Sequence, residues 1–177
     1  DNAVANTTAN NAVQAIVTDA NGNLLAGQAV TFSASNAATV TAVIGTTGAD
    51  GLATATLTSA TAGTSVVTAT LSNSASATVN TTFVADAATA TIASGHFTVT
   101  TDNAVANTTA NNAVQAIVTD AHGNPVARQT VMFIADNNAT VTAVIETTGA
   151  DGIATATLTS ATAGTSVVTA YLNFQAA

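Results

Sequence analysis

The amino-acid sequence predicts an all-β protein made of two tandem β-sandwich domains. Three observations support this prediction. Apolar residues alternate with threonine and serine along several segments, turn signals separate those segments, and the second half of the chain repeats the first. Alternation with a period of two is typical of strands that bury one face.

Four segments of the first half show this alternation, within 11–19, 28–35, 51–59 and 63–71. Their intervening residues are mostly polar, as expected for strands with one solvent face. The residues predicted to face the core are Val13, Ala15 and Val17; Val30, Phe32 and Ala34; Ala53, Ala55 and Leu57; and Val67, Ala69 and Leu71.

Turn signals lie between the predicted strands. They read DANGN at 19–23, GADG at 48–51 and TAG at 61–63. Asn-Gly and Asp-Gly supply residues that adopt positive φ, which tight turns require. The spacing predicts about seven short strands per hundred residues, which favours a sandwich of immunoglobulin-like type.

The repeat defines the domain organisation. Residues 1–76 align without gaps to residues 102–177, and 60 of the 76 aligned positions are identical. Residues 1–20 match 102–121 at every position. A repeat of this length is too long for one coil of a solenoid and indicates a whole domain duplicated in tandem.

The boundary between the domains is predicted near Asp86. Segment 77–85 is predicted as the last strand of the first copy. Segment 89–101 is predicted as the first strand of the second, with Ile92, Phe97 and Val99 as its apolar residues. We therefore expect domains at 1–86, without a first strand, and at 87–177, without a last strand. Truncation of a longer array and a strand supplied by another chain both remain explanations.

Composition excludes several classes of partner. Charged residues make up 6% of the chain, the net charge is −8, and Arg128 is the only Lys or Arg. Nucleic acids and anionic membranes bind Lys- and Arg-rich surfaces, so neither is expected as a partner. No apolar run is long enough to insert this segment into a membrane. The absence of cysteine excludes disulfides and thiolate metal sites.

The motifs also resemble a known family. Segments 17–32 and 118–133 read VTDANGNLLAGQAVTF and VTDAHGNPVARQTVMF; segments 47–63 and 148–164 read TGADG(L/I)ATATLTSATAG, and VVTA follows both. They resemble the bacterial immunoglobulin-like domain 1 repeats in the stalks of intimins and invasins. Two positions depart from the family pattern, because Leu24 replaces a proline and Arg128 replaces a glycine.

The resemblance implies an extracellular location at the bacterial cell surface. The protein would be anchored in the outer membrane through parts not present in this segment. Such domains stack between the anchor and an adhesive tip, so the implied partners are neighbouring Ig-like domains of the same chain. The cysteine-containing, lectin-like tip module has no counterpart here. The resemblance therefore implies a stalk.

The sequence predicts no enzyme, no cofactor and no catalytic, cofactor-binding or metal-binding residues. His96 and His122 lack a companion acid or nucleophile, and no GxSxG motif occurs. Two groups of residues suggest a calcium hypothesis. Asp19, Asn21 and Asn23 alternate like the start of a calcium loop, although a β-turn explains them without an ion. At the domain boundary, Asp86 and Asp102 would have to converge.

The leading functional prediction is a pair of structural spacer domains from a bacterial surface adhesin. Stacked end to end, they would form an elongated rod of about 75 Å, from strands that rise roughly 3.3 Å per residue. The alternative is a module that itself binds a host-cell receptor or sister adhesin chains, including by strand complementation between chains. Its signal is a set of larger residues in the second copy: Met132, Ile134, Glu146, Tyr171 and Phe174 replace Thr31, Ser33, Gly45, Thr70 and Asn73.

Overall fold

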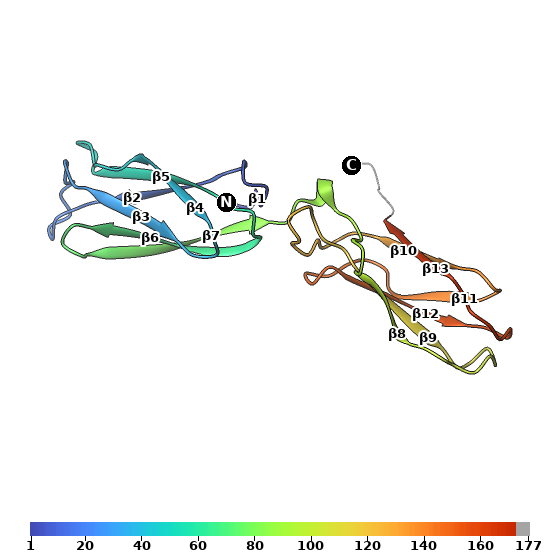
Figure 1. Cartoon of the computed structure of the whole chain (residues 1–177). Helices are drawn as coiled ribbons and strands as arrows, with labels where there is room; N and C mark the ends of the chain where they lie inside the picture. Colours follow the sequence, from blue (N-terminus) through green and yellow to red (C-terminus); the bar gives the residue numbers. More distant parts are fainter. Residues whose placement is uncertain (173–177) are drawn as a thin grey trace. The chain divides into compact units, whose positions relative to one another are not determined.

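The structure is a computed structural model that describes residues 1–172 (Figure 1). The chain divides into two compact units, Asp1–Ala85 (unit 1) and Asp86–Ala177 (unit 2). The described residues are almost entirely strands and turns, with one short 3-10 turn. The all-β fold class predicted from the sequence is confirmed, and each unit is described below by itself.

Unit 1 is a two-layer sandwich. One sheet has the strand order β1-β7-β6-β3 and the other has β2-β5-β4. Neighbouring strands are antiparallel, except that β1 and β7 are parallel. The strands are β1 (Ala3–Val4), β2 (Asn11–Ile16), β3 (Val30–Ala34), β4 (Thr39–Ile44), β5 (Leu52–Thr58), β6 (Gly63–Leu71) and β7 (Ser76–Val84).

Unit 2 repeats this plan with different edge strands. One sheet has the order β11-β12-β9-β8 and the other contains β10 and β13. In unit 2, β9 pairs with both β12 and β8. In unit 1, the counterpart of β9 is β2, which pairs only with β5 among the described strands. The elements are η1 (Ala87–Thr89), β8 (Phe97–Thr101), β9 (Asn112–Ile117), β10 (Val131–Ala135), β11 (Thr140–Ile145), β12 (Ile153–Thr159) and β13 (Val168–Leu172).

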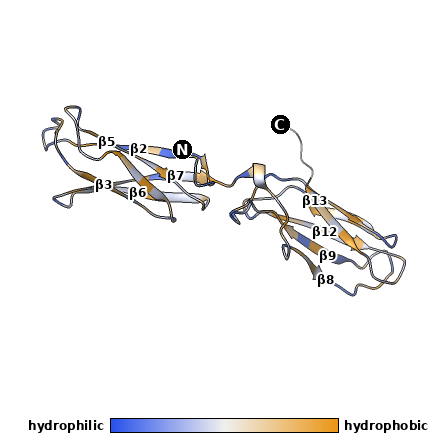
Figure 2. Ribbon diagram, turned by 45° about the horizontal axis from the view of Figure 1, so that its top comes forward, coloured by the Kyte–Doolittle hydropathy of each residue, from blue (hydrophilic) through white to orange (hydrophobic). Residues whose placement is uncertain are grey.

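The cores form where the predicted apolar faces meet, and Figure 2 shows apolar residues alternating with polar ones along the strands. β5 buries Ala53, Ala55 and Leu57 while its threonines stay half-buried, as the period of two predicted. In unit 1, Leu57 packs with Phe83 in the buried cluster. In unit 2, Phe97 packs against the corresponding cluster from the β8 side. Each fully buried Leu or Phe contributes about 1.5–3 kcal/mol.

The GADG turn requires its second glycine. Gly51 has φ +65°, and a Cβ placed on it would lie 2.7 Å from the Val17 carbonyl oxygen. Gly152 has φ +71° and would meet the corresponding Val118 carbonyl. Any other residue would strain the backbone and clash with this carbonyl oxygen, so the turn predicted from Asp-Gly depends on this glycine in both units.

The strand predicted over 89–101 is shorter than expected, since β8 begins only at Phe97. The preceding residues instead form the turn η1, where the Asp86 carboxylate accepts a hydrogen bond from the Ala88 N–H at 3.1 Å. Gly95, at φ +84°, then turns the chain before β8. Local capping by an aspartate and a glycine turn therefore interrupt the strand that the apolar pattern predicted.

Candidate functional site

The DANGN segment is a self-contained turn. The Asp19 carboxylate accepts hydrogen bonds from the N–H groups of Asn21 and Asn23, both at 2.9 Å, and from the Asn23 side-chain amide at 2.8 Å. The hydrogen bond from the Asn23 side chain is the largest of the contributions that lower the pKa of Asp19. Because its oxygens are already used within the turn, the structure favours the turn interpretation of these residues over the calcium loop.

Asp120 makes the same turn in unit 2 and holds a further segment. Its carboxylate binds the His122 and Asn124 N–H groups and the Asn124 amide, and it also accepts the Asp86 N–H at 3.0 Å. Burial acts to raise the pKa of Asp120, but these hydrogen bonds outweigh it and lower the pKa overall. Asp120 therefore attaches the segment before β8 to the end of β9.

The structure does not bring Asp86 and Asp102 together, so the convergence hypothesis is wrong. Asp86 contacts Asp120, just beyond the end of β9. Asp102 lies by the start of β9, where Ala104 donates to the Asn112 side chain at 2.9 Å. Six residues of strand separate these positions, about 20 Å at 3.3 Å per residue. The antiparallel pairing of β8 with β9 carries the chain away from Asp86 and places the two acids at opposite ends of the sheet.

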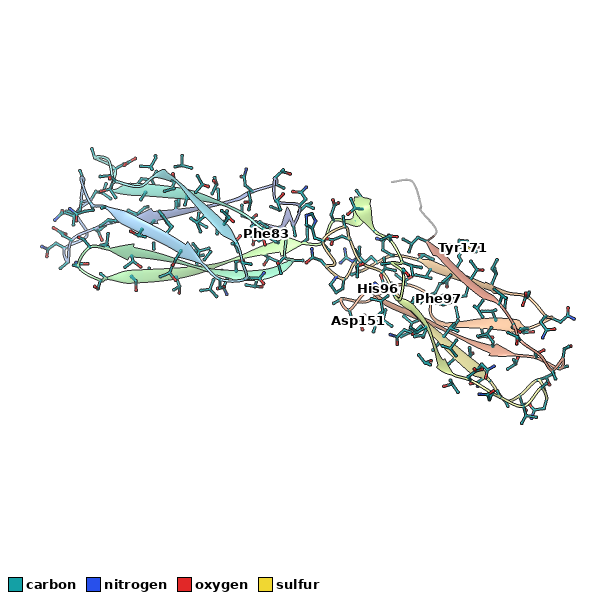
Figure 3. The ribbon with its side chains drawn as sticks, viewed as in Figure 1. Phe83, His96, Phe97, Asp151 and Tyr171 are labelled. Carbon is teal, nitrogen blue, oxygen red and sulfur yellow. The ribbon has the colours of Figure 1, made fainter. Side chains whose placement is uncertain are left out.

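The two histidines lie apart from any acidic cluster. His96 precedes β8, and its Nδ1 is buried without a hydrogen-bond partner; Figure 3 labels its position in unit 2. His122 is exposed in the turn closed by Asp120. Within residues 1–172, no three His, Cys, Asp or Glu side chains form a group that could hold a metal ion. In the same residues, no helix has the length and apolar character to cross a membrane.

In unit 1, β7 lies between β6 and β1. It pairs antiparallel with β6 over Gly63–Thr70 and parallel with Ala3 and Val4 of β1. Phe83 is 1% exposed and packs in the cluster with Leu57. The Asn11 side-chain amide donates to the Thr82 carbonyl at 2.8 Å, which fixes the position of β7 along its neighbours.

In unit 2, the residues that correspond to those around β7 border an open groove. It has a volume of about 500 Å³ and is bordered by β8, β9, β12, β13 and the loops that precede β9 and β13. We call it the strand groove. Its lining residues are Val99, Asp102, Asn103, Ala104, Val105, Ala106, Ala110, Asn112, Val114, Ala139, Leu158, Thr159, Ser160, Thr162, Ala163, Gly164, Thr165, Ser166 and Val168.

Segments that border the strand groove form less strand structure and are more exposed than the corresponding segments of unit 1. β6 begins at Gly63, but its counterpart β13 begins only at Val168, and the counterpart of β1 at 104–105 is not a strand. Val105 is 68% exposed, and Val99, which pairs with the core residue Val114, is 61% exposed. These residues border the space that a strand like β7 would cover.

A second candidate surface is the outward face of β10 and β13. Met132 pairs with Tyr171, and Ile134 lies one position further along the same face. These three side chains are between 39% and 53% exposed, and Tyr171 is labelled in Figure 3. In unit 1 the same face carries Thr31, Ser33 and Thr70. We call the three residues the β10–β13 patch.

Glu146 and Phe174 are the other two larger residues that distinguish the second copy from the first. Glu146 follows β11, where its carbonyl accepts the Val131 N–H at 2.9 Å, the bond that Gly45 makes in unit 1. Its side chain is exposed and lies outside the β10–β13 patch. Phe174 lies outside the described residues. Sequence reasoning therefore singled out the three patch residues but did not show that they share one face. It predicted that the second domain lacks a last strand, but not which residues line the groove at that edge.

Comparisons with known proteins assign the family. The family model for the bacterial Ig-like domain (group 1) matches residues 1–84 and 94–177. The inverse autotransporter adhesin YeeJ of Escherichia coli K12 is 34% identical over 167 residues, which cover 89% of this chain and 7% of YeeJ. This chain thus spans a small part of that relative.

Two solved structures share the fold. Yersinia pseudotuberculosis InvD has a TM-score of 0.70 at 24% identity, covering 97% of this chain and 50% of InvD. The Escherichia coli adhesin FdeC has a TM-score of 0.52 at 24% identity, covering 94% of this chain and 55% of FdeC. Together with the family match over both units, these findings show that the chain belongs to the bacterial Ig-like domain (group 1) family.

Proposed function

We propose that this chain is a pair of spacer domains from the extracellular stalk of a bacterial surface adhesin. The observation that carries the proposal is the tandem duplication: one sandwich plan is built twice, in a family whose relative YeeJ is an adhesin far longer than this segment. Repeated domains extend a chain in proportion to their number. The stalk would present an adhesive region away from the cell, anchored by other parts of the protein.

The parallel pairing of β1 with β7 suits unit 1 to resist tension. Asn2 and Ala5 donate to the carbonyls of Thr82 and Val84 at 2.9 and 2.8 Å. Because β1 and β7 are parallel, opposite forces applied at Asp1 and Ala85 slide these strands past one another. Their hydrogen bonds then resist together instead of breaking one at a time.

Force spectroscopy with Asn11→Ala tests the tension-bearing role. The Asn11 side chain joins Ala3 to Thr82, with hydrogen bonds of 3.1 and 2.8 Å. Its loss is expected to lower the unfolding force of unit 1. Asn112→Ala is the matched control, because the Asn112 side chain accepts a hydrogen bond from the Ala104 N–H at 2.9 Å but holds no counterpart of β7 among the described residues. Equal reductions in both units would contradict this role for β1 and β7.

Coated-bead adhesion tests the spacer role itself. Beads carrying the 177-residue chain are expected to bind neither cells nor one another. The chain inserted between a surface anchor and a known binding domain should increase the distance at which that domain captures its ligand. Adhesion by the chain alone would contradict a purely passive spacer.

The β10–β13 patch favours a second candidate, a module that itself contacts a receptor or a sister chain. Exposed Met, Ile and Tyr side chains on neighbouring strands resemble the apolar centre of a protein interface. The variant Met132→Thr, Ile134→Ser, Tyr171→Thr restores the residues of unit 1 at these positions. If this candidate is correct, bead adhesion occurs with the natural chain and is lost in the triple variant.

A further inference from the structure

We propose that Asn21 is a site of spontaneous covalent modification, at which the side-chain amide is lost as ammonia through a cyclic imide formed with the backbone nitrogen of Gly22. The co-reactant is water, and the product is an aspartate or an isoaspartate in the turn of unit 1. Unit 2 has no such site, because His122 occupies the corresponding position. This inference is independent of the spacer role, since it concerns the chemistry of one turn.

The chain contains a single Asn-Gly pair, because only Asn21 among its asparagines is followed by glycine. Glycine has no Cβ to shield its backbone nitrogen, and it reaches conformations that other residues avoid. Gly22 has φ +85°, and a Cβ built on it would meet no atom within 4 Å. The surroundings of the attacking nitrogen are therefore open to the movement that closes the imide ring.

The Asn21 side chain is available for this reaction. Asn21 is exposed, and within residues 1–172 its side chain makes no hydrogen bond. Two other exposed asparagines differ in this respect. The Asn23 amide donates to the Asp19 carboxylate at 2.8 Å, and the Asn73 side-chain oxygen accepts the Ala75 N–H at 3.0 Å. Asn21 therefore combines the reactive neighbour with an unrestrained amide.

The reaction balances without an oxidant or a reductant. Ring closure joins the Gly22 nitrogen to Cγ of Asn21 and breaks the Cγ–Nδ2 bond. The Gly22 nitrogen gives its proton to solvent, and Nδ2 takes up a proton and leaves as ammonia. Water then opens the imide at Cγ to give aspartate, or at the backbone carbonyl of residue 21 to give isoaspartate. Each product carries a carboxylate, so unit 1 gains a negative charge at neutral pH.

The turn controls how often the reacting atoms meet. The Gly22 N–H donates to the Asp19 carbonyl oxygen at 3.1 Å, and the Asn21 N–H donates to the Asp19 carboxylate at 2.9 Å. The first of these hydrogen bonds occupies the nitrogen that must attack, and the second holds the backbone of Asn21 in the turn. The reaction therefore proceeds from turns that have opened locally, as exposed loops do most readily.

The product weakens the turn in which it forms. A carboxylate at position 21 lies two residues from the Asp19 carboxylate, and the like charges repel each other. Isoaspartate also lengthens the backbone by one carbon atom, which moves Asn23 away from the Asp19 oxygens that it now contacts. The bridge between Thr18 and Leu24 joins the ends of this turn. Unit 1 would thus acquire with age a weakened turn that unit 2 does not develop.

Incubation of the 177-residue chain at mildly alkaline pH tests the proposal, with peptide mapping and isoaspartate detection as the readout. We expect aspartate and isoaspartate at position 21, formed faster as the pH rises because the Gly22 nitrogen must lose its proton. Asn21→His installs the residue of unit 2 and should abolish both products there. Asp19→Ala should accelerate the reaction about tenfold, since loss of the carboxylate's turn hydrogen bonds favours the open turn by roughly this factor.

His122→Asn provides a matched test in unit 2, because it builds a second Asn-Gly pair in the corresponding turn. Asp120 closes that turn and is buried, so the new asparagine should react more slowly than Asn21. This comparison does not depend on the folding of Asp19→Ala. Three results would overturn the proposal: an intact Asn21 under conditions that modify a free peptide of residues 17–26, equal rates at Asn73 and Asn21, or a rate at position 122 that matches or exceeds the rate at Asn21.

Discussion

Units 1 and 2 share most of their sequence yet cover opposite edges of the sandwich. Unit 1 closes one sheet with β7, whereas unit 2 closes the other with β8. Asn11 is consequently buried and Asn112 is half-exposed, while Asp19 is half-exposed and Asp120 is buried. The exposure of a residue in this fold therefore depends on which edge strand is present, even where the local sequence is identical.

Alanine substitution of the phenylalanine in each edge strand should show the largest difference in destabilisation between the two units. Phe83→Ala is expected to destabilise unit 1 by about 3–5 kcal/mol, the usual cost of deleting a fully buried ring. Phe97→Ala should destabilise unit 2 by only about 1–2 kcal/mol, because Phe97 is half-exposed. Hydrogen exchange followed separately in each unit measures both free energies. Equal losses would contradict the idea that β7 contributes more to its core than β8.

Removal of Asp120 should destabilise unit 2 more than removal of Asp19 destabilises unit 1. Asp120→Ala removes the acceptor of the partly buried Asp86 N–H, at a cost of about 2 kcal/mol. The exposed turn around Asp19 can replace its hydrogen bonds with water, so Asp19→Ala is the matched control. Denaturant unfolding at neutral pH provides the measurement, and a larger effect at Asp19 would contradict the role of Asp120 in anchoring the segment before β8.

Asp120 also makes the stability of unit 2 sensitive to acid. Its pKa is lowered in the folded state from the ordinary value of 3.8, so the unfolded chain binds the proton more readily. The stabilisation is complete above about pH 4 and is lost as the pH falls through the folded-state pKa. Unfolding of unit 2 between pH 5 and pH 2 should therefore become less pH-dependent in Asp120→Asn.

Arg128 provides a smaller test of backbone strain. It has φ +63°, while Gly27 occupies the same position in unit 1 at φ +74°. Both N–H groups donate to the equivalent threonine carbonyl at 2.8 Å, so the hydrogen bond is the same and only the side chain differs. Arg128→Gly should stabilise unit 2 by about 1 kcal/mol, and Gly27→Arg should destabilise unit 1 by a similar amount. Thermal unfolding measures both; destabilisation by Arg128→Gly would show that the arginine side chain makes a compensating contact.

Calcium is expected to have the smallest effect. The Asp19 and Asp120 carboxylates are occupied by turn hydrogen bonds, and Asp86 is remote from Asp102. The melting temperature of each unit should be the same in calcium and in chelator. A calcium-dependent increase confined to one unit would reveal a site that these groups do not explain and would make the two units differ in a new way.

Much of the architecture follows from the sequence alone. The alternation around Ala53, Ala55 and Leu57 specifies which face is buried, because side chains on a strand point alternately to its two sides. Asp-Gly specifies the turn at Gly51, because this backbone conformation strains any side chain. The duplicated 76 residues specify the repetition of the sandwich. These features depend on neighbours in the chain, so a local pattern is sufficient to predict them.

Contacts between distant segments are visible only in the tertiary structure. The tertiary structure separates Asp86 from Asp102, shortens the strand before Phe97 and places Met132 beside Tyr171. It also leaves a groove whose lining includes Ala106, Leu158 and Val168, the counterparts of buried residues in unit 1. The pairing of strands distant in the sequence determines each of these features. A strand's sequence predicts that it will pair and which face it will bury, but its partner, and hence the exposed edge, depends on every other strand in the sheet.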